Sequence, residues 1–380
     1  MFRPQIQKTR VLVLIAVFNL LMVYFSVNSK VKIYQIGYAD KIKAAEIMQN
    51  TINEYKKLIN YNISDKDIYK TGLVGLKTSI ITTKEEISGT NMLSSKVACT
   101  HPNFASAIVE MFYELNIKEG DVIAVSMTGS FPGANIALLS ACRAMKINPI
   151  IISSAGSSAW GANRPEFSWP VIESLLYNNN LINHKSVAYS IGGANDTGDN
   201  LQHEGSSLIS DEIFNLLNDK NEFVNELTLL ENVNKKMEIY KKYYNLNDYS
   251  LFINIGGGSA SLGYGIEQDS LNVGIVSPLD LEFITSESFK NTISHIFLDS
   301  DISMINIKNI NKLGVYYDLY PPSLDKKIFK GPLFLKYSNY NPIIIIIGLM
   351  SSLLVIISIG AYSHIQIKKR MEAHESESVI

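Results

Sequence analysis

"DVIAVSMTGSFPGANIALLSACRAM", residues 121–145, reads as a strand, a tight loop and a helix in succession. The apolar run 122–125 is too short for a helix of its own. Gly129 and Gly133 then break the chain, and residues 134–145 are good helix formers mixed with small residues. Where a glycine loop enters a helix, free backbone N–H groups and the helix dipole favour an anion. The stretch therefore predicts an α/β unit whose loop binds an anion or a polarised carbonyl.

The same succession of strand, small-residue loop and helix recurs along the chain. Later apolar runs end in the loops SSAGSSAWGAN (153–163), GGANDTGD (192–199) and GGGSAS (256–261). Helices between apolar strands indicate right-handed crossovers, and hence a mostly parallel sheet with helices on both faces. In such an α/β fold, ligands bind beyond the carboxyl ends of the strands, so we expect these loops to cluster at one edge of the sheet.

Two apolar segments flank this region and predict terminal transmembrane helices. Residues 11–27 and 343–362 both have about the length of a membrane span, roughly 17–25 residues. The first could instead be a signal peptide, cleaved near Ser26 or Ser29. It lacks a small-x-small pattern after the apolar run, which favours an uncleaved anchor. The lipid bilayer is thus an expected partner.

The distribution of basic residues predicts the orientation in a cell membrane. Arg3, Lys8 and Arg10 precede the first span, and Lys368, Lys369 and Arg370 follow the second. Basic residues accumulate on the cytoplasmic side, so both termini are expected in the cytoplasm and the large central region outside.

These features predict a division of the chain. Residues 31–61 carry apolar side chains at helical spacing and predict a helix leaving the membrane. The expected parts are a cytoplasmic N-terminus (1–10), a transmembrane helix (11–27), an extracytoplasmic helical extension (28–96), an extracytoplasmic α/β domain (97–341), a transmembrane helix (343–362) and a cytoplasmic tail (363–380).

Composition excludes several classes of function. The 380 residues carry a net charge of −2, so the chain lacks the basic footprint of a nucleic-acid-binding protein. Its two cysteines, Cys99 and Cys142, could pair outside the cytoplasm or remain buried thiols. The sequence has no CxxC pair and no histidine-rich ligand set, so we expect no structural zinc, no other metal and no cofactor.

The loop after the first strand is the sharpest candidate site. Thr128, Gly129 and Ser130 could bind a ligand, with Ser130 as a hydrogen-bond donor or a nucleophile. The loop could equally be a tight turn with a capping serine. It matches neither the G-x-S-x-G elbow, because Ser130 follows the first glycine directly, nor the P-loop, because no Lys-Ser/Thr follows Gly133.

Three further loops offer binding groups. In the second loop, Ser157 and Trp160 could line a pocket and Arg164 could clamp a carboxylate, although a packed tryptophan and a surface arginine fit the pattern too. In the third, Asp196 and Asp199 could orient a histidine, bind a cation together with Asn195, or cap the next helix. In the fourth, Gly257 and Ser259 could form a nest of N–H groups for a carboxylate, or a turn that needs glycine.

A catalytic alternative uses the same loops. His101 begins a helix just before the first strand and is the best candidate base for Ser130, although a capping histidine fits as well. Ser130 would then attack an amide, His101 would assist and Asp196 would orient the histidine.

Taken together, these motifs resemble a known family. The stretches THPNFASAIVEMFYELNIKEGDVIAVSMTGSFPGANIALLSACRAM, SSAGSSAWGANRPEFSWP, SIGGANDTG and NIGGGSASLG, framed by two terminal spans, are similar to the poly-gamma-glutamate system protein family. The resemblance implies a membrane protein beside the poly-gamma-glutamate synthase complex. That machinery is a cytoplasmic ATP-dependent amide ligase with small membrane partners, which makes an anionic polymer. No catalytic residue is carried over from the family.

The resemblance and the loops lead to one expected function and two alternatives. We expect an accessory membrane protein of poly-gamma-glutamate synthesis and export, whose outer domain binds the polymer. The first alternative is an extracytoplasmic serine hydrolase or transpeptidase acting on γ-glutamyl bonds. The second is a scaffold that holds the synthase complex through its spans. The expected binding residues are Thr128, Gly129, Ser130, Ser157, Trp160, Arg164, Asn195, Gly257 and Ser259.

Overall fold

The computed structural model describes residues 8–83, 90–217, 221–264, 271–284 and 286–373. It forms two compact units. One comprises Gln35–Phe334 and contains the central sheet. The other combines the described parts of Met1–Tyr34 and Leu335–Ile380. The sequence places a boundary at 96/97, whereas the structure places the boundaries at 34/35 and 334/335.

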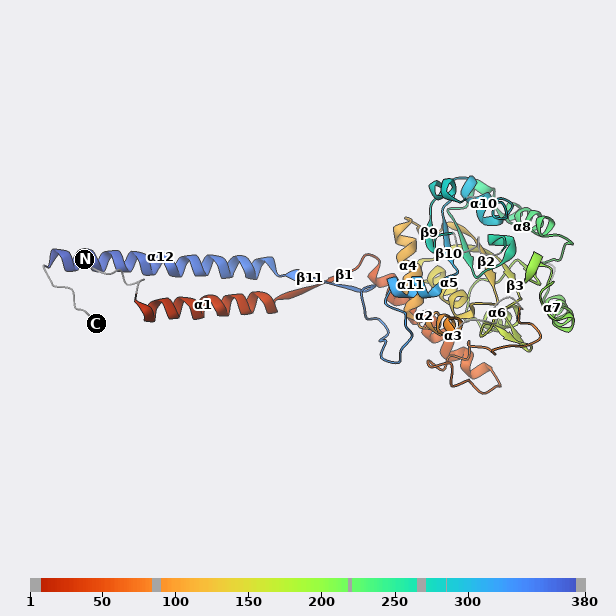
Figure 1. Cartoon of the computed structure of the whole chain (residues 1–380), viewed down its shortest axis with the longest axis horizontal. Helices are drawn as coiled ribbons and strands as arrows, with labels where there is room; N and C mark the ends of the chain where they lie inside the picture. The colour runs from red at the N-terminus through yellow and green to blue at the C-terminus, as the bar shows by residue number, and fades with distance from the viewer. Residues whose placement is uncertain (1–7, 84–89, 218–220, 265–270, 285, 374–380) are drawn as a thin grey trace. The chain divides into compact units, whose positions relative to one another are not determined.

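A seven-stranded sheet forms the centre of the larger unit (Figure 1). Its strands, in spatial order, are β7 (Glu222–Val224), β6 (Ala188–Ser190), β3 (Asn148–Ser154), β2 (Val122–Thr128), β8 (Leu251–Ile255), β10 (Met304–Ile307) and β9 (Gly274–Val276). All neighbours pair in parallel except β9, which runs antiparallel to β10. The expectation of an α/β fold with a mostly parallel sheet is confirmed.

Helices cover both faces of this sheet. Ile152 and Ser153 are consecutive on β3 and therefore point to opposite faces. Ile152 joins the cluster formed with α8 (Leu229–Tyr243) and α10 (Ile293–Asp299), in which Phe252 and Phe297 stack with ring centroids 4.7 Å apart. Ser153 instead accepts a hydrogen bond of 3.2 Å from the Trp169 indole of α6 (Trp169–Asn178).

The α6 side carries further helices. There α5 (Pro132–Met145) makes the crossover from β2 to β3, and α4 (Asn103–Glu114) and α2 (Tyr38–Leu58) pack against it. The remaining elements of this unit include α3 (Thr90–Ala98), α7 (His203–Leu216), α9 (Ser259–Leu262), α11 (Ile310–Tyr316), the β4–β5 pair (Asn163–Arg164 and Phe167–Ser168), and the 3-10 turns Ala194–Asp196, Leu246–Asp248 and Pro278–Phe283.

Local sequence explains where several helices begin. The Thr228 hydroxyl accepts a hydrogen bond from the Glu231 N–H, and the Glu231 carboxylate accepts one from the Thr228 N–H, a capping box that starts α8. Pro132 stands in the first turn of α5, where a missing N–H costs nothing.

Cys99 and Cys142 are both buried free thiols in the structure. Of the two alternatives that the sequence left open, a disulfide or two buried thiols, the structure therefore shows the second.

The second unit contains two helices that are long and apolar enough to cross a membrane, by length and composition. These are α1 (Thr9–Asn28) and α12 (Pro342–Glu372), which pack against each other. At Gly348 they approach closely, since an added Cβ there would lie 3.6 Å from Met22 Cβ.

A short antiparallel ribbon in the same unit is formed by the strand after α1 and the strand before α12. Strand β1 (Lys30–Tyr34) pairs with β11 (Leu335–Tyr340). The sequence predicts a helix over 31–61, and this is wrong at its start, because α2 begins only at Tyr38. Lysine and apolar residues alternate in KVKIY with a period of two, which fits a strand.

Candidate functional site

A cavity of about 200 Å³ opens beyond the carboxyl ends of β2 and β8. From β2 the chain proceeds outward to β3, β6 and β7, then returns to β8 on the opposite side of β2. The strand order therefore reverses between β2 and β8, and this switch point is where open α/β sheets bind their ligands.

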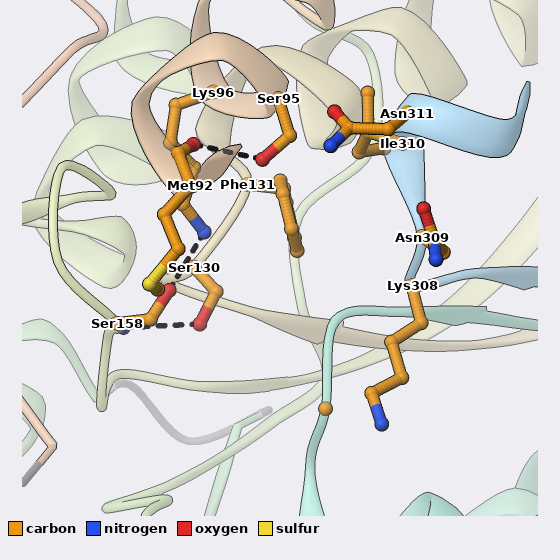
Figure 2. Close-up of a pocket in the computed structure, with 11 residues that line it drawn as sticks. Met92, Ser95, Lys96, Ser130, Phe131, Ser158, Lys308, Asn309, Ile310 and Asn311 are labelled. Atoms are coloured by element: carbon orange, nitrogen blue, oxygen red, sulfur yellow. Dashed lines mark hydrogen bonds between the residues drawn. The ribbon is translucent and has the colours of Figure 1, made fainter. Parts of the chain in front are cut away.

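Loops after four strands, together with two helices, supply the walls. The strand-end residues are Ser130 and Phe131 after β2, Ser158 after β3, Gly257 after β8, and Lys308 and Asn309 after β10. Helix α3 adds Met92, Ser95 and Lys96, and α11 adds Ile310 and Asn311. Figure 2 shows Lys96, Ser158 and Ser130 on one side of the cavity and Lys308 with Asn309 on the other.

Lys96 and Ser158 make a short polar contact in the cavity. Lys96 Nζ donates a hydrogen bond of 2.6 Å to Ser158 Oγ (Figure 2). The Lys96 residue is 2% exposed and Ser158 is 1% exposed. Nζ also lies 3.5 Å from the centroid of the Phe131 ring. The amine thus sits between a hydroxyl and an aromatic face, almost removed from bulk water.

Ser130 is tied to the same serine. Its Oγ accepts a hydrogen bond of 3.1 Å from the Ser158 N–H, and its own N–H donates to Thr128 Oγ1 at 3.3 Å. Thr128 itself is buried at the end of β2, whereas Ser130 is partly exposed in the cavity wall. Of the expected site residues, Ser130 and Gly257 line the cavity.

The N-terminus of α5 does not present its amides to the cavity. The N–H groups of Gly133 and Ala134 face the Cys99 thiol, whose pKa burial raises to about 12. A Cβ on Gly133 would lie 2.7 Å from the Cys99 carbonyl oxygen. The end of α3 therefore covers this helix start, and the anion expected there would have to bind beside it, at Ser130 and Phe131.

Gly129 and Ser157 hold two loops together. Ser157 Oγ donates a hydrogen bond of 3.0 Å to the Gly129 carbonyl, which also accepts one of 2.7 Å from the Ala162 N–H. A Cβ on Gly129 would lie 2.6 Å from the Ala155 carbonyl oxygen. Glycine is needed here because backbone meets backbone, and the Ser157 hydroxyl supports the loop that carries Ser158.

Trp160 and Arg164 are not among the residues that line the cavity. The Trp160 backbone exchanges hydrogen bonds with the segment before α3, donating at 2.7 Å to the Leu76 carbonyl. The Arg164 guanidinium stacks on the Tyr61 ring, with Cζ 4.1 Å from the ring centroid. The structure thus shows an aromatic partner for this arginine, and Arg164 is not among the cavity-lining residues.

Asp196 belongs to a buried ion pair. Its carboxylate lies 2.5 Å from Lys236 Nζ and accepts a hydrogen bond of 2.9 Å from Ser190 Oγ. Asn195 Nδ2 donates to Asp199 at 2.7 Å, and its Oδ1 accepts from the Tyr264 hydroxyl. These contacts fasten the loop after β6 to α8.

The loops after β6 and β8 also contact each other. Ser259 Oγ donates a hydrogen bond of 3.0 Å to the Gly193 carbonyl. Gly256 has φ +100°, and a Cβ there would overlap Thr128 Oγ1, so this turn needs glycine.

Within the described ranges no three His, Cys, Asp or Glu side chains converge to hold a metal ion.

His101 is occupied elsewhere. Its Nδ1 accepts a hydrogen bond of 3.2 Å from the Asn103 N–H, and its ring packs edge-on against Tyr69. Burial lowers the pKa of the imidazole to about 4. Among the hydrogen bonds of the described residues, none joins His101 to Ser130 or to Asp196. The structure does not bring these three residues together as a catalytic set.

Sequence reasoning missed Lys96, Ser158 and Lys308. Lys308 directly follows a strand, so the rule that ligands bind at strand ends could have found it. Ser158 stands beside Ser157 in a loop already singled out. Lys96 gives no such signal, because it reaches the cavity from a helix that precedes the sheet.

No family model, no curated protein and no solved structure matches the chain.

Proposed function

We propose that this chain is an accessory membrane protein of poly-gamma-glutamate synthesis and export, and that its α/β unit binds the polymer in the cavity beyond β2 and β8. In this proposal α1 and α12 span the cell membrane, both termini are cytoplasmic and the α/β unit is extracytoplasmic. The bilayer and the poly-gamma-glutamate synthase complex are its partners.

The observation that carries the proposal is the set of donors around the cavity. Lys96 and Lys308 contribute amines from two different elements, and Ser130, Asn309 and Asn311 contribute hydroxyl and amide groups. No aspartate or glutamate is among the described residues that line it. Charge-assisted hydrogen bonds from such donors are the usual means of holding a carboxylate.

The size of the cavity supports recognition of a small part of the polymer. Its volume of about 200 Å³ lies below the roughly 300–1,000 Å³ of most small-molecule pockets. A net charge of −2 provides no strong long-range attraction for a polyanion. Both features favour local binding of one or a few γ-linked glutamyl units.

The catalytic alternative with Ser130, His101 and Asp196 receives less support. The imidazole of His101 accepts a hydrogen bond from the Asn103 N–H, and the carboxylate of Asp196 pairs with Lys236. Binding is therefore the better-supported function for these expected residues.

Calorimetric titration tests the proposal. The full chain in lipid nanodiscs would be titrated with a γ-linked glutamate pentamer, alongside Lys308→Ala and, as a matched control, Lys312→Ala. Lys312 lines a different hollow, next to Tyr316. We expect the Lys308 change to weaken binding about tenfold or more, as for loss of a charged hydrogen bond of roughly 1.5–3 kcal/mol. Absence of binding by the unaltered chain, or equal affinity in both variants, would overturn the proposal.

A further inference from the structure

The contact between Lys96 and Ser158 goes beyond what binding requires. We propose that Ser158 Oγ is a nucleophile activated by Lys96 Nζ, so that the cavity carries out acyl transfer at an amide bond. The choice of a γ-glutamyl amide as substrate rests on the proposed function, whereas the identity of the nucleophile and the base does not.

Geometry supplies the first argument. The 2.6 Å between Nζ and Oγ is a distance at which a proton passes directly from a hydroxyl to an amine. A nucleophilic serine requires an adjacent base of this kind, because a free hydroxyl is weakly reactive. Both residues line the cavity, so a substrate bound there would meet the pair.

The surroundings of the amine supply the second argument. Lys96 is 2% exposed, so bulk water does not separate Nζ from the Ser158 hydroxyl. The Phe131 ring face, 3.5 Å away, would stabilise the ammonium once it forms. The ring face thus favours the cation that the proposed proton transfer forms.

Ser130 has a positioning role in this proposal. Its Oγ accepts the Ser158 N–H at 3.1 Å and so fixes the backbone of the nucleophile. Ser157, the residue before the nucleophile, donates a hydrogen bond from its hydroxyl to the Gly129 carbonyl. These two hydrogen bonds fix the backbone of Ser158 and of the residue before it.

The reaction balances with water as the only co-reactant. The Ser158 hydroxyl proton passes to Lys96 Nζ while Oγ bonds to the amide carbon and the carbonyl electron pair moves to oxygen. The pair then returns, the C–N bond breaks, and the leaving amine takes the proton from Lys96. Water next attacks the ester, gives a proton to Lys96, and releases a carboxylic acid as the proton returns to Ser158 Oγ. The net change is hydrolysis of an amide to an acid and an amine.

Labelling with a fluorophosphonate tests the nucleophile. The full chain in nanodiscs would be treated with the probe, digested, and mapped by mass spectrometry. We expect one dominant adduct, on Ser158. Mapping on the unaltered chain requires no variant, so misfolding of a variant cannot obscure it. An adduct missing from Ser158 would overturn the proposal.

Variants test the base. Lys96→Met and Lys96→Arg should each lower the labelling rate by roughly 10²–10⁴-fold, the usual contribution of a general base. Arginine can still donate a hydrogen bond but cannot act as a base at neutral pH. Lys312→Ala, a change in a different hollow next to Tyr316, should label normally. Labelling of Lys96→Arg at the unaltered rate would overturn the role of Lys96.

The two proposals fail separately. The labelling assay contains no polymer, so a missing adduct would leave glutamate binding untouched. Loss of pentamer binding in calorimetry would remove the γ-glutamyl substrate and leave the nucleophile standing.

Discussion

Lys96 Nζ lies 2.6 Å from Ser158 Oγ, although 62 residues separate the two in the chain. The serine is carried there by β3 and the lysine by α3, which covers the start of α5. Their meeting point is the cavity beyond the reversal of strand order. The proposed binding site and the proposed reactive pair therefore coincide at the edge of the sheet where α/β folds concentrate ligands.

Removing Lys236 should destabilise the fold, because Asp196 would remain as an unpaired buried charge. Both side chains are 3% exposed and their charged atoms are 2.5 Å apart. We expect Lys236→Met to lower the free energy of unfolding by about 3–5 kcal/mol, and the double change with Asp196→Asn to recover most of it. Urea unfolding followed by the fluorescence of Trp160 and Trp169 measures both.

The control for this pair is an exposed one. Lys290 and Glu287 lie 2.6 Å apart with side chains 53% and 83% exposed. Lys290→Met should leave the unfolding midpoint unchanged, since exposed ion pairs contribute little. An equal loss of stability in Lys236→Met and Lys290→Met would show that the burial of the ion pair does not cause the destabilisation.

His101 should make stability depend on pH. Burial lowers the pKa of its imidazole to about 4 in the folded chain, while the unfolded chain keeps a value near 6.5. Between these values only the unfolded state binds the proton, so stability falls as the pH falls from 6.5 to 4. Relative to His101→Gln, we expect a loss of up to about 3 kcal/mol over this window, measured by urea unfolding. If the free energy of unfolding changed with pH in the same way in both proteins, the contribution of His101 to the pH dependence would be refuted.

Glu212 should act in the opposite direction. Burial raises the pKa of its carboxyl group to about 7, and Ser168 Oγ donates to it at 2.6 Å. The folded chain then holds a proton that the unfolded chain has lost above pH 4.5, so stability falls as the pH rises from 4.5 to 7. Glu212→Gln keeps a hydrogen-bond acceptor without the charge. We expect it to be more stable than the unaltered chain by about 1 kcal/mol at pH 7.5, and equal stability there would contradict this.

Thiol labelling tests the proposed orientation. The native thiols of Cys99 and Cys142 are buried, and burial raises the pKa of both, so they should not react. Leu227 is 91% exposed and Met371 is 60% exposed. In intact cells a membrane-impermeant maleimide should label Leu227→Cys at once, and Met371→Cys only after permeabilisation. The reverse pattern would place the α/β unit in the cytoplasm.

The sheet could be predicted from the sequence because its signals are local. Each buried strand is a short apolar run followed by small residues, as in 122–130, and helical segments between the runs imply parallel pairing. Because the loops after parallel strands meet at one edge of the sheet, Ser130 and Gly257 could be predicted to lie there, and both line the cavity. The strand β1 escaped prediction because its partner β11 lies about 300 residues later in the chain.

The partners of charged side chains could not be predicted, because they depend on distant packing. Arg164 looks available for a carboxylate until Tyr61 is placed against it. Asp196 looks like a helix cap until Lys236 of α8 meets it. His101 and Ser130 are close in sequence, yet Asn103 holds the imidazole. Lys96 becomes a site residue only through the placement of α3.

Photocrosslinking tests the central claim most directly. A γ-linked glutamate pentamer carrying a diazirine would be irradiated with the full chain in nanodiscs, with and without excess unlabelled pentamer, and the adducts mapped by mass spectrometry. We expect competed adducts on cavity residues, above all on Met92, Phe131 or Ile310. Adducts confined to the acidic surface of α7 near His203 and Glu204, or adducts that excess pentamer does not suppress, would contradict the account.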